Sequence, residues 1–285
     1  MSPTEPTWTA DDNRAPLSEL MSRENFPVAT RLLPVRHRVH LINVYAFARL
    51  VDDIGDEVLP DRRVEYLDLV EKDLDRIYAG ATPELRPLRA LARTIAARDI
   101  PAAPFHGLIQ ANRQDQTVSR YATFDELLAY CELSANPVGH IVLHLFGAAA
   151  PERMRLSDRV CTALQIIEHL QDIGEDYRRG RIYLPGEDMR RFGCVEEDLT
   201  AITTPTRLRG LVSFEADRAS RLLTEGEPVA RGLPGWGRLA VTGYLAGGRA
   251  ALAVLRRGGY DVLGRRLRPG RTRLMTEWLR ALGGR

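Results

Sequence analysis

The segment Val44-Tyr-Ala-Phe-Ala-Arg-Leu-Val-Asp-Asp-Ile-Gly-Asp-Glu57 combines an apolar helical pattern with a row of acidic residues. Its apolar positions 44, 47, 50, 51 and 54 recur with the period of an α-helix that faces a core. Asp52 and Asp56 are one helical turn apart, so a helix stacks them on a single face, and Arg49 precedes Asp52 on the same stripe. The segment therefore predicts a largely buried helix that carries carboxylates on one side.

A second segment, Ala163-Leu-Gln-Ile-Ile-Glu-His-Leu-Gln-Asp-Ile-Gly-Glu-Asp-Tyr-Arg-Arg-Gly-Arg-Ile-Tyr-Leu-Pro185, repeats this combination. Glu168, Asp172 and Asp176 follow one another at intervals of one helical turn, and Gln165 lies one turn earlier. Carboxylates that face an apolar interior are costly unless a cation compensates them. Two such helices aimed at each other predict an oxygen-ligand site suited to Mg²⁺ and completed by the phosphate oxygens of a substrate.

The alternative is that each acidic stripe is a solvated helix face, which is the usual meaning of a single pair of aspartates at this spacing. The occurrence of two such stripes, both in otherwise apolar helices, favours the metal site. Nearby arginines could neutralise the rest of a diphosphate through forked hydrogen bonds; they are Arg49, Arg178, Arg179 and Arg181.

Helical periodicity continues along nearly the whole chain, and strand patterns are scarce. Helices are predicted over residues 19–33, 35–57, 62–78, 85–98, 104–118, 124–147, 156–180, 205–225, 235–257 and 271–282. Pro137 predicts a kink or break in the helix over 124–147. Residues 1–17 are polar and predict a loose N-terminal tail, followed by a single all-α domain over residues 18–285.

The overall composition excludes several classes of protein. The net charge of +2 is too small to indicate a nucleic-acid partner. The chain has no apolar run long enough to span a bilayer and no apolar signal region at its N-terminus, so we expect a cytoplasmic protein. Cys131, Cys161 and Cys194 are far apart, which excludes a disulfide scaffold and a conventional cysteine zinc site.

Two further patterns have ordinary explanations. His140 and His144 are one turn apart and could ligate a metal, but no E-x-x-H or H-E-x-x-H motif accompanies them, so we predict a structural role. The arginine-rich end contains Arg256-Arg257 and Arg265-Arg266-Leu-Arg268. We predict a solvated surface there, with contact to anionic lipid headgroups as the alternative.

Both acidic segments resemble the aspartate-rich motifs of the head-to-head prenyl synthases, that is, the squalene and phytoene synthases. Residues 45–56 resemble the first motif and residues 165–185 the second, while Asp115, residues 121–131 and Gly259-Tyr-Asp-Val-Leu263 also fit. The segments Glu24-Asn-Phe-Pro-Val-Ala29 and Ser134-Ala-Asn-Pro-Val-Gly139 are similar to the hopanoid-pathway branch, whose members convert presqualene diphosphate to hydroxysqualene. The resemblance implies an isoprenoid-synthase fold, with helices around a central apolar cavity that both acidic helices line.

The resemblance also implies roles for individual residues. Two or three Mg²⁺ ions around a diphosphate would be held by Asp52, Asp56, Glu168, Asp172 and Asp176. Arg49 and Arg181 would assist the departing diphosphate, and Asn25, Gln165 and Tyr183 would contact the substrate. Phe26, Phe47 and Tyr130 would form the wall around the carbocation, although Phe47 and Tyr130 could also be ordinary core aromatics.

This chain departs from the family pattern at two positions. Glu168 stands where the second motif usually has asparagine, which adds a negative charge to the expected metal cluster. Gly248 stands where a tyrosine is often found, which implies a reshaped cavity floor.

Several reactions remain open at this point. Ionisation of presqualene diphosphate could end in capture by water or by hydride, and the branch resemblance favours water. No dinucleotide-binding fingerprint is found, and NADPH is not expected. Alternatives are condensation of two farnesyl diphosphates to presqualene diphosphate, a phytoene synthase, or a non-catalytic lipid-binding or assembly relative. We expect other enzymes of squalene and hopanoid biosynthesis as functional partners. Peripheral contact with the inner face of the membrane is compatible with this expectation.

Overall fold

A computed structural model describes residue 21 and residues 32–283 of the chain, and this part is built from helices. In chain order they are α2 (Val35–Asp56), α3 (Pro60–Tyr78), α4 (Arg86–Arg98), α5 (Ala103–Gln114), α6 (Phe124–Ser134), α7 (Asn136–Leu145), α8 (Pro151–Arg178), α9 (Gly186–Phe192), the 3-10 helix η2 (Glu196–Thr200), α10 (Thr206–Gly226), α11 (Pro228–Arg231), α12 (Gly235–Arg257) and α13 (Arg271–Gly283). Within the described ranges no strand forms, so the predicted all-α fold is confirmed.

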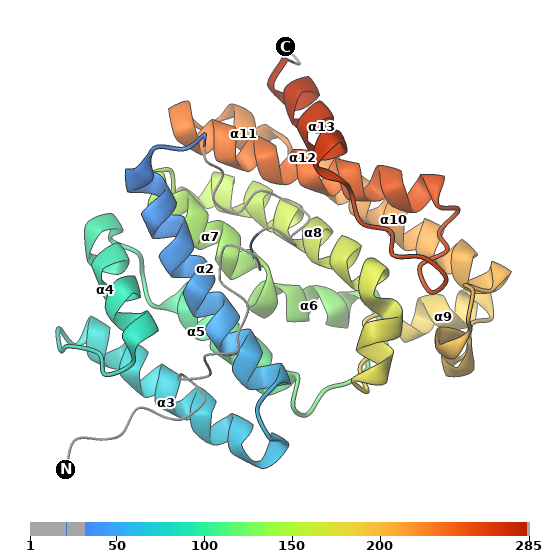
Figure 1. Cartoon of the computed structure of the whole chain (residues 1–285), viewed down its shortest axis with the longest axis horizontal. Helices are drawn as coiled ribbons and strands as arrows, with labels where there is room; N and C mark the ends of the chain where they lie inside the picture. Colours follow the sequence, from blue (N-terminus) through green and yellow to red (C-terminus); the bar gives the residue numbers. More distant parts are fainter. Residues whose placement is uncertain (1–20, 22–31, 284–285) are drawn as a thin grey trace.

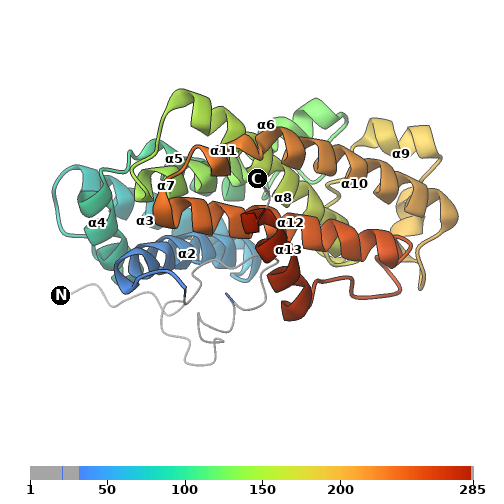
Figure 2. The same cartoon turned by 90° about the horizontal axis from the view of Figure 1, so that it is seen from above.

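The long helix α8 runs through the middle of the molecule (Figure 1). It packs most extensively on α10 and α7, and also contacts α6 and α12. On the other side, α2 packs against α3, α4 and α5, and α7 also contacts α2. Helix α13 rests on α12 at the outside of the bundle (Figure 2). Helices α2 and α8, which carry the two acidic segments, therefore belong to the same bundle.

The boundaries of the helices differ from the sequence predictions in a few places. The predicted helix over 124–147 is two helices, α6 and α7, which are separated at Ala135. Pro137 occupies the first turn of α7, where its missing N–H needs no intrahelical partner. Helices α9, η2 and α11 were not predicted, because such short elements show little periodicity.

Some predictions fall on residues that are not described. The predicted tail over residues 1–17 lies outside the described residues, as does most of the predicted helix over 19–33. In the described part, no helix has the length and apolarity that crossing a membrane requires.

Two loops that are distant in sequence are joined by backbone hydrogen bonds. The loop after α8 runs beside the loop before α6, where Ile182 N donates to Ser119 O at 2.9 Å. Further along, Gly186 N donates to Tyr121 O, also at 2.9 Å. This pairing fixes the position of the residues on either side of Ile182 relative to α6.

Candidate functional site

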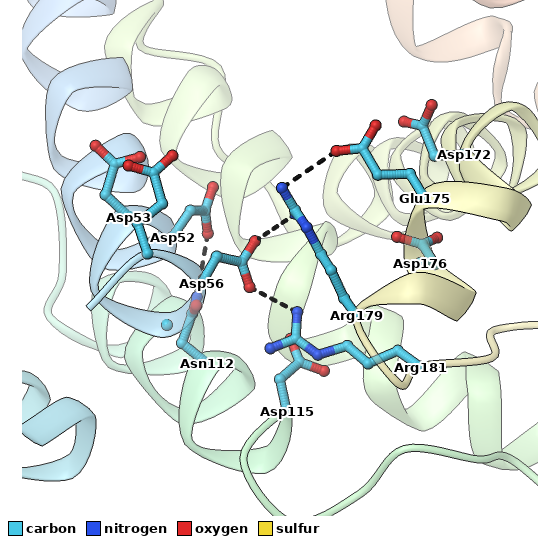
Figure 3. A network of polar contacts seen from close by, with 12 residues as sticks. Asp52, Asp53, Asp56, Asn112, Asp115, Asp172, Glu175, Asp176, Arg179 and Arg181 are labelled. Atoms are coloured by element: carbon cyan, nitrogen blue, oxygen red, sulfur yellow. Dashed lines mark hydrogen bonds and ion pairs between the residues drawn. The ribbon is translucent and has the colours of Figure 1, made fainter. Parts of the chain in front are cut away.

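The two acidic segments border one polar cavity of about 230 Å³. Asp52 and Asp56 reach it from α2, and the second segment contributes Glu168, Asp172 and Asp176 from α8. Figure 3 shows the aspartates of α2 and those of α8 on opposite sides of Arg179. The sequence prediction that acidic stripes from two helices converge on one interior space therefore agrees with the geometry.

Asp56 is held by two arginines that follow the second acidic segment. Arg179 Nη1 donates to its Oδ2 at 3.0 Å, and Arg181 Nη1 donates to its Oδ1 at 2.6 Å (Figure 3). The Arg181 side chain is largely buried, so this ion pair is shielded from solvent more than a surface pair would be. These contacts link the end of α2 directly to the end of α8.

Asp52 lies one helical turn before Asp56 on α2, and its side chain borders the cavity. Asn112 Nδ2 on α5 donates to its Oδ1 at 3.1 Å. The surrounding protein atoms, together with the negative charge of Asp56, raise the pKa of Asp52 to about 7, although the hydrogen bond from Asn112 acts in the opposite direction and the side chain itself is exposed at the cavity. A carboxylate in this position is stabilised in its ionised form by a bound cation.

On the opposite wall, Asp172 is held by an arginine from the C-terminal part of the chain. Arg268 Nη2 donates to both Asp172 oxygens at 2.8 Å. Burial raises the pKa of Asp172, while the ion pair with Arg268 limits the rise. For Arg268 the predicted solvated surface was therefore wrong. The reason is that the segment after α12 folds back onto α8, where Gln171 Nε2 donates to Leu267 O.

Asp115 is the centre of an aromatic network at the edge of the polar cavity. Tyr130 OH donates to Asp115 Oδ2 at 2.7 Å, and Tyr183 OH donates to Oδ1 at 3.1 Å. The ring of His169 stacks on Tyr183 with a centroid separation of 3.7 Å, and its Nδ1 lies 3.6 Å from Asp176 Oδ2. Tyr130, expected in the wall around a carbocation, thus directs its hydroxyl to the polar network.

An apolar cavity of about 290 Å³ adjoins the polar one. Helices α2, α7, α8 and α12 supply most of its lining, which includes Leu41, Val142, Leu164 and Val241. Five residues border both cavities: Asp52, Leu108, Ser134, Gln165 and Glu168. The combined space suits an amphipathic molecule with an anionic head and a long apolar tail.

Gly248, which replaces the family's tyrosine, is closely packed. A Cβ atom at this position would lie 2.8 Å from Leu164 Cδ2, so a larger residue would displace the lining of α8. Tyr244, one turn earlier on α12, borders the apolar cavity instead.

Two predicted site residues in the described part of the chain, Phe47 and Arg49, do not border the polar cavity. Phe47 is fully buried and packs edge-on against Phe105 with a centroid separation of 5.3 Å, bordering neither cavity. Arg49 borders the apolar cavity, but its guanidinium pairs with Asp53 at 2.7 Å and with Glu57 at 3.3 Å. Phe47 points away from the cavities because it lies on a different face of α2 from Asp52. The face with Asp52 borders the cavities, and the face with Phe47 packs on α5. Asn25 and Phe26 lie outside the described residues.

The carboxylates of α2 and those of α8 form two incomplete sets of ligands for Mg²⁺. Among the described residues, no three His, Cys, Asp or Glu side chains are grouped closely enough to hold a metal ion by themselves. The cavity nevertheless offers hard oxygen donors from both sides, and Mg²⁺ in proteins commonly takes one or two carboxylates and completes its shell with water and phosphate oxygens. The donor set therefore suits Mg²⁺ that is bound together with a diphosphate. His140, by contrast, pairs with Asp158 at 2.7 Å, in line with its predicted structural role.

Comparison with known proteins agrees with this geometry. Residues 21–273 match the model of the squalene/phytoene synthase family. The chain belongs to this family. This squalene/phytoene synthase is 40% identical over 211 residues to a hydroxysqualene synthase from Rhodopseudomonas palustris, a match that covers 73% of the chain and 70% of the relative. It is 36% identical over 200 residues to a phytoene synthase from Mycobacterium tuberculosis, covering 69% of the chain and 65% of the relative.

Solved structures of related proteins share the fold. The crystal structure of squalene synthase HpnC from Alicyclobacillus acidocaldarius superposes with a TM-score of 0.76 at 43% sequence identity, covering 86% of this chain and 93% of that one. A dehydrosqualene synthase in complex with a ligand superposes with a TM-score of 0.85 at 26% identity, covering 93% of this chain and 94% of that one. Both confirm that this synthase has the expected isoprenoid-synthase architecture.

Sequence reasoning missed three residues of the site: Asn112, His169 and Arg268. Asn112 and His169 are single polar positions in helices whose periodicity indicates only amphipathic packing. His169 directly follows Glu168 in the acidic segment, and this position was the one sequence signal that could have indicated a role for it in the site. Arg268 belongs to an arginine-rich run, a composition that is typical of solvated surfaces.

Proposed function

We propose that this synthase is a hydroxysqualene synthase, which ionises presqualene diphosphate and captures the rearranged carbocation with water. The observation that carries the proposal is the junction of an acidic polar cavity with an apolar cavity, bordered jointly by Asp52, Gln165 and Glu168. The names of the relatives from Rhodopseudomonas palustris and Sinorhizobium fredii support this reaction.

The residues that would hold Mg²⁺ are Asp52 and Asp56 on one side, and Glu168, Asp172 and Asp176 on the other. When bound there, Mg²⁺ supplies Lewis-acid stabilisation of the departing diphosphate. Cations held by these acidic side chains would neutralise the charge of the leaving group.

The side chains around the cavity have separate tasks in this reaction. Arg179 and Arg181 orient the diphosphate by charge-assisted hydrogen bonds, since both already point into the polar cavity. The apolar cavity surrounds the isoprenoid and excludes bulk water from the carbocation. The ring of Tyr244 at this cavity offers an aromatic face to a nearby positive charge. One water then forms a C–O bond with the carbocation and releases a proton, which yields the alcohol.

The test is a product analysis with purified protein and Mg²⁺. Presqualene diphosphate or farnesyl diphosphate is supplied, each with and without NADPH, and the extracted lipids are identified. We expect an alcohol from presqualene diphosphate without NADPH, carrying ¹⁸O when the reaction is run in H₂¹⁸O. Formation of presqualene diphosphate or phytoene-type products from prenyl diphosphates would instead favour the condensing reaction, which the similarity to phytoene synthases supports as the second candidate.

The proposed reaction also implies partners by its chemistry. One enzyme must join two prenyl diphosphates to supply the cyclopropyl substrate, and another must remove the hydroxyl group of the product. Because the product is a long apolar alcohol, we propose peripheral contact with the inner face of the membrane during its release.

A further inference from the structure

The segment that follows α12 is anchored so that Arg268 meets the second acidic motif. Thr204 N donates to Asp261 Oδ1 at 2.9 Å, and Gln171 on α8 donates to the backbone oxygen of Leu267. Gly174 allows a close approach, since a Cβ there would lie 3.1 Å from Leu263 Cδ2. The position of Arg268 beside α8 is therefore set by contacts of the residues that precede it in the chain.

Arg268 Nη2 bridges the two oxygens of Asp172, so the guanidinium occupies the position from which a cation would bind both oxygens at once. A guanidinium and a divalent cation on the same carboxylate would also repel each other. If Asp172 binds Mg²⁺ through both oxygens during the reaction, Arg268 must first withdraw from this bridging position.

The structure provides space into which Arg268 can move. Asp172 and Arg268 border a second pocket of about 550 Å³, and Asp172 borders the polar cavity as well. Arg178, Arg265 and Arg266 also border this pocket. A side chain that leaves Asp172 can stay close to the cavity without any movement of the backbone segment.

We propose that Arg268 is an exchangeable counter-ion that holds Asp172 while no metal is present and transfers to the diphosphate when metal and substrate bind. This inference rests on the proposed function, because it assumes a metal-bound diphosphate at the polar cavity. In this role Arg268 is a positioning residue. It keeps Asp172 from binding a cation in the absence of diphosphate and stabilises the anion once the cation has arrived.

The exchange predicts that the divalent cation and the diphosphate bind cooperatively. A cation alone must displace the Arg268 guanidinium from Asp172, which weakens its binding. When diphosphate is present, the displaced guanidinium gains a new anionic partner, so the penalty is removed. The cooperativity should depend on Arg268 rather than on the positive charge of the pocket in general.

The experiment measures Mn²⁺ binding to the full chain by EPR, with and without inorganic diphosphate, for the wild type, Arg268→Gln and Arg266→Gln. Arg266→Gln is the matched control, because it removes the same charge from the same pocket without contact to Asp172. Without diphosphate, we expect Arg268→Gln to bind Mn²⁺ about fivefold more tightly than the control. This ratio corresponds to the interaction energy of a partly exposed ion pair. It should also show a smaller gain in affinity on addition of diphosphate.

Equal Mn²⁺ affinities and equal diphosphate effects in the two variants would overturn the proposal. If instead the wild type binds no Mn²⁺ even with diphosphate, the metal site fails and the exchange proposal fails with it. The product analysis does not depend on Arg268, so it tests the proposed function separately from the exchange. Circular dichroism of both variants confirms that each is folded before the binding data are compared.

Discussion

Each acidic side chain that borders the polar cavity from α2 has a partner elsewhere in the chain. Asp52 accepts from Asn112, and Asp56 accepts from Arg179 and Arg181. On α8, Asp172 accepts from Arg268. Because these partners come from α5, the loop after α8 and the segment after α12, the cavity is held together by contacts across the whole fold.

At this scale the first prediction concerns Asp172→Asn. The substitution keeps the size of the side chain but removes the charge that a divalent cation requires, so turnover should fall by more than about 100-fold. Steady-state assay of diphosphate release measures the loss. Asp217→Asn on the surface of α10 is the control, and it should keep the wild-type rate. Full activity of Asp172→Asn with an unchanged melting temperature would contradict the metal assignment.

The second prediction concerns Glu168→Asn, which restores the residue usual in the family. If Glu168 acts as an oxygen ligand, the asparagine supplies a neutral oxygen, and turnover should stay within about tenfold of the wild type at raised Mg²⁺ concentration. The Mg²⁺ concentration for half-maximal rate is the measurement. Complete loss of activity at every Mg²⁺ concentration would show that the glutamate has a duty of its own.

The acidic residues could be predicted from the sequence because they interrupt an apolar helical pattern at a fixed spacing. Their partners could not, because a partner such as Asn112 or Arg268 is selected by tertiary packing that periodicity does not contain. Phe47 shows the same limit, since the helical stripe identifies it as buried without distinguishing the core from a cavity wall.

At the scale of secondary-structure elements, the longer helices were predicted and the short ones were missed. Helix α12 was predicted with both of its observed ends, because Gly258 and Gly259 follow a strongly periodic segment. The division between α6 and α7 agrees with the kink or break that Pro137 predicts. Helices α9 and η2 cover the region of the chain where no periodic pattern extends beyond one or two turns.

Helices α6, α9 and α10 meet at a buried charged cluster outside the cavities. Arg218 Nη1 on α10 donates to Asp188 on α9 at 2.8 Å and to Glu215 Oε1 at 2.9 Å. The guanidinium also lies over the ring of Phe124 on α6, 3.9 Å from its centroid. One cation thus serves two carboxylates, and burial together with the charge of Asp188 raises the pKa of Glu215 to about 8.

The third prediction follows from this cluster. Unfolded Glu215 ionises near pH 4.3, while the folded chain keeps the proton up to about pH 8. The contribution of Glu215 to the free energy of unfolding is therefore complete below the pKa of the unfolded chain. It is lost as the pH rises through the pKa of the folded chain. Glutamine does not ionise, so Glu215→Gln avoids this loss. As the pH rises from about 5 to about 9, the melting temperature of the variant should therefore rise by a few degrees relative to that of the wild type.

Thermal melts of both proteins at several pH values across this range are the measurement. Glu225→Gln, an exposed glutamate at the end of the same helix, is the control and should follow the wild type at every pH. A constant difference between Glu215→Gln and the wild type across the range would contradict the assignment.

At the level of the whole protein, the charged cavity and the apolar cavity adjoin and share five bordering residues. The fourth prediction is that Mg²⁺ and inorganic diphosphate together raise the melting temperature by more than the sum of their separate effects. A ligand that binds only the folded state stabilises it according to its concentration and affinity. When each of two ligands raises the affinity for the other, their combined stabilisation exceeds the sum of the separate ones. Differential scanning fluorimetry measures the shift, and additive shifts would argue against a shared site.

The seam between the loop before α6 and the loop after α8 limits how this enzyme can change shape. Because Ile182 and Gly186 are tied to Ser119 and Tyr121, the adjoining Arg181 cannot swing as an independent flap. Arg181, which holds Asp56 at the end of α2, therefore has a backbone position that is fixed by the loop before α6. A substitution that breaks the hydrogen bonds of this seam would disturb the polar cavity although the altered residue does not border it.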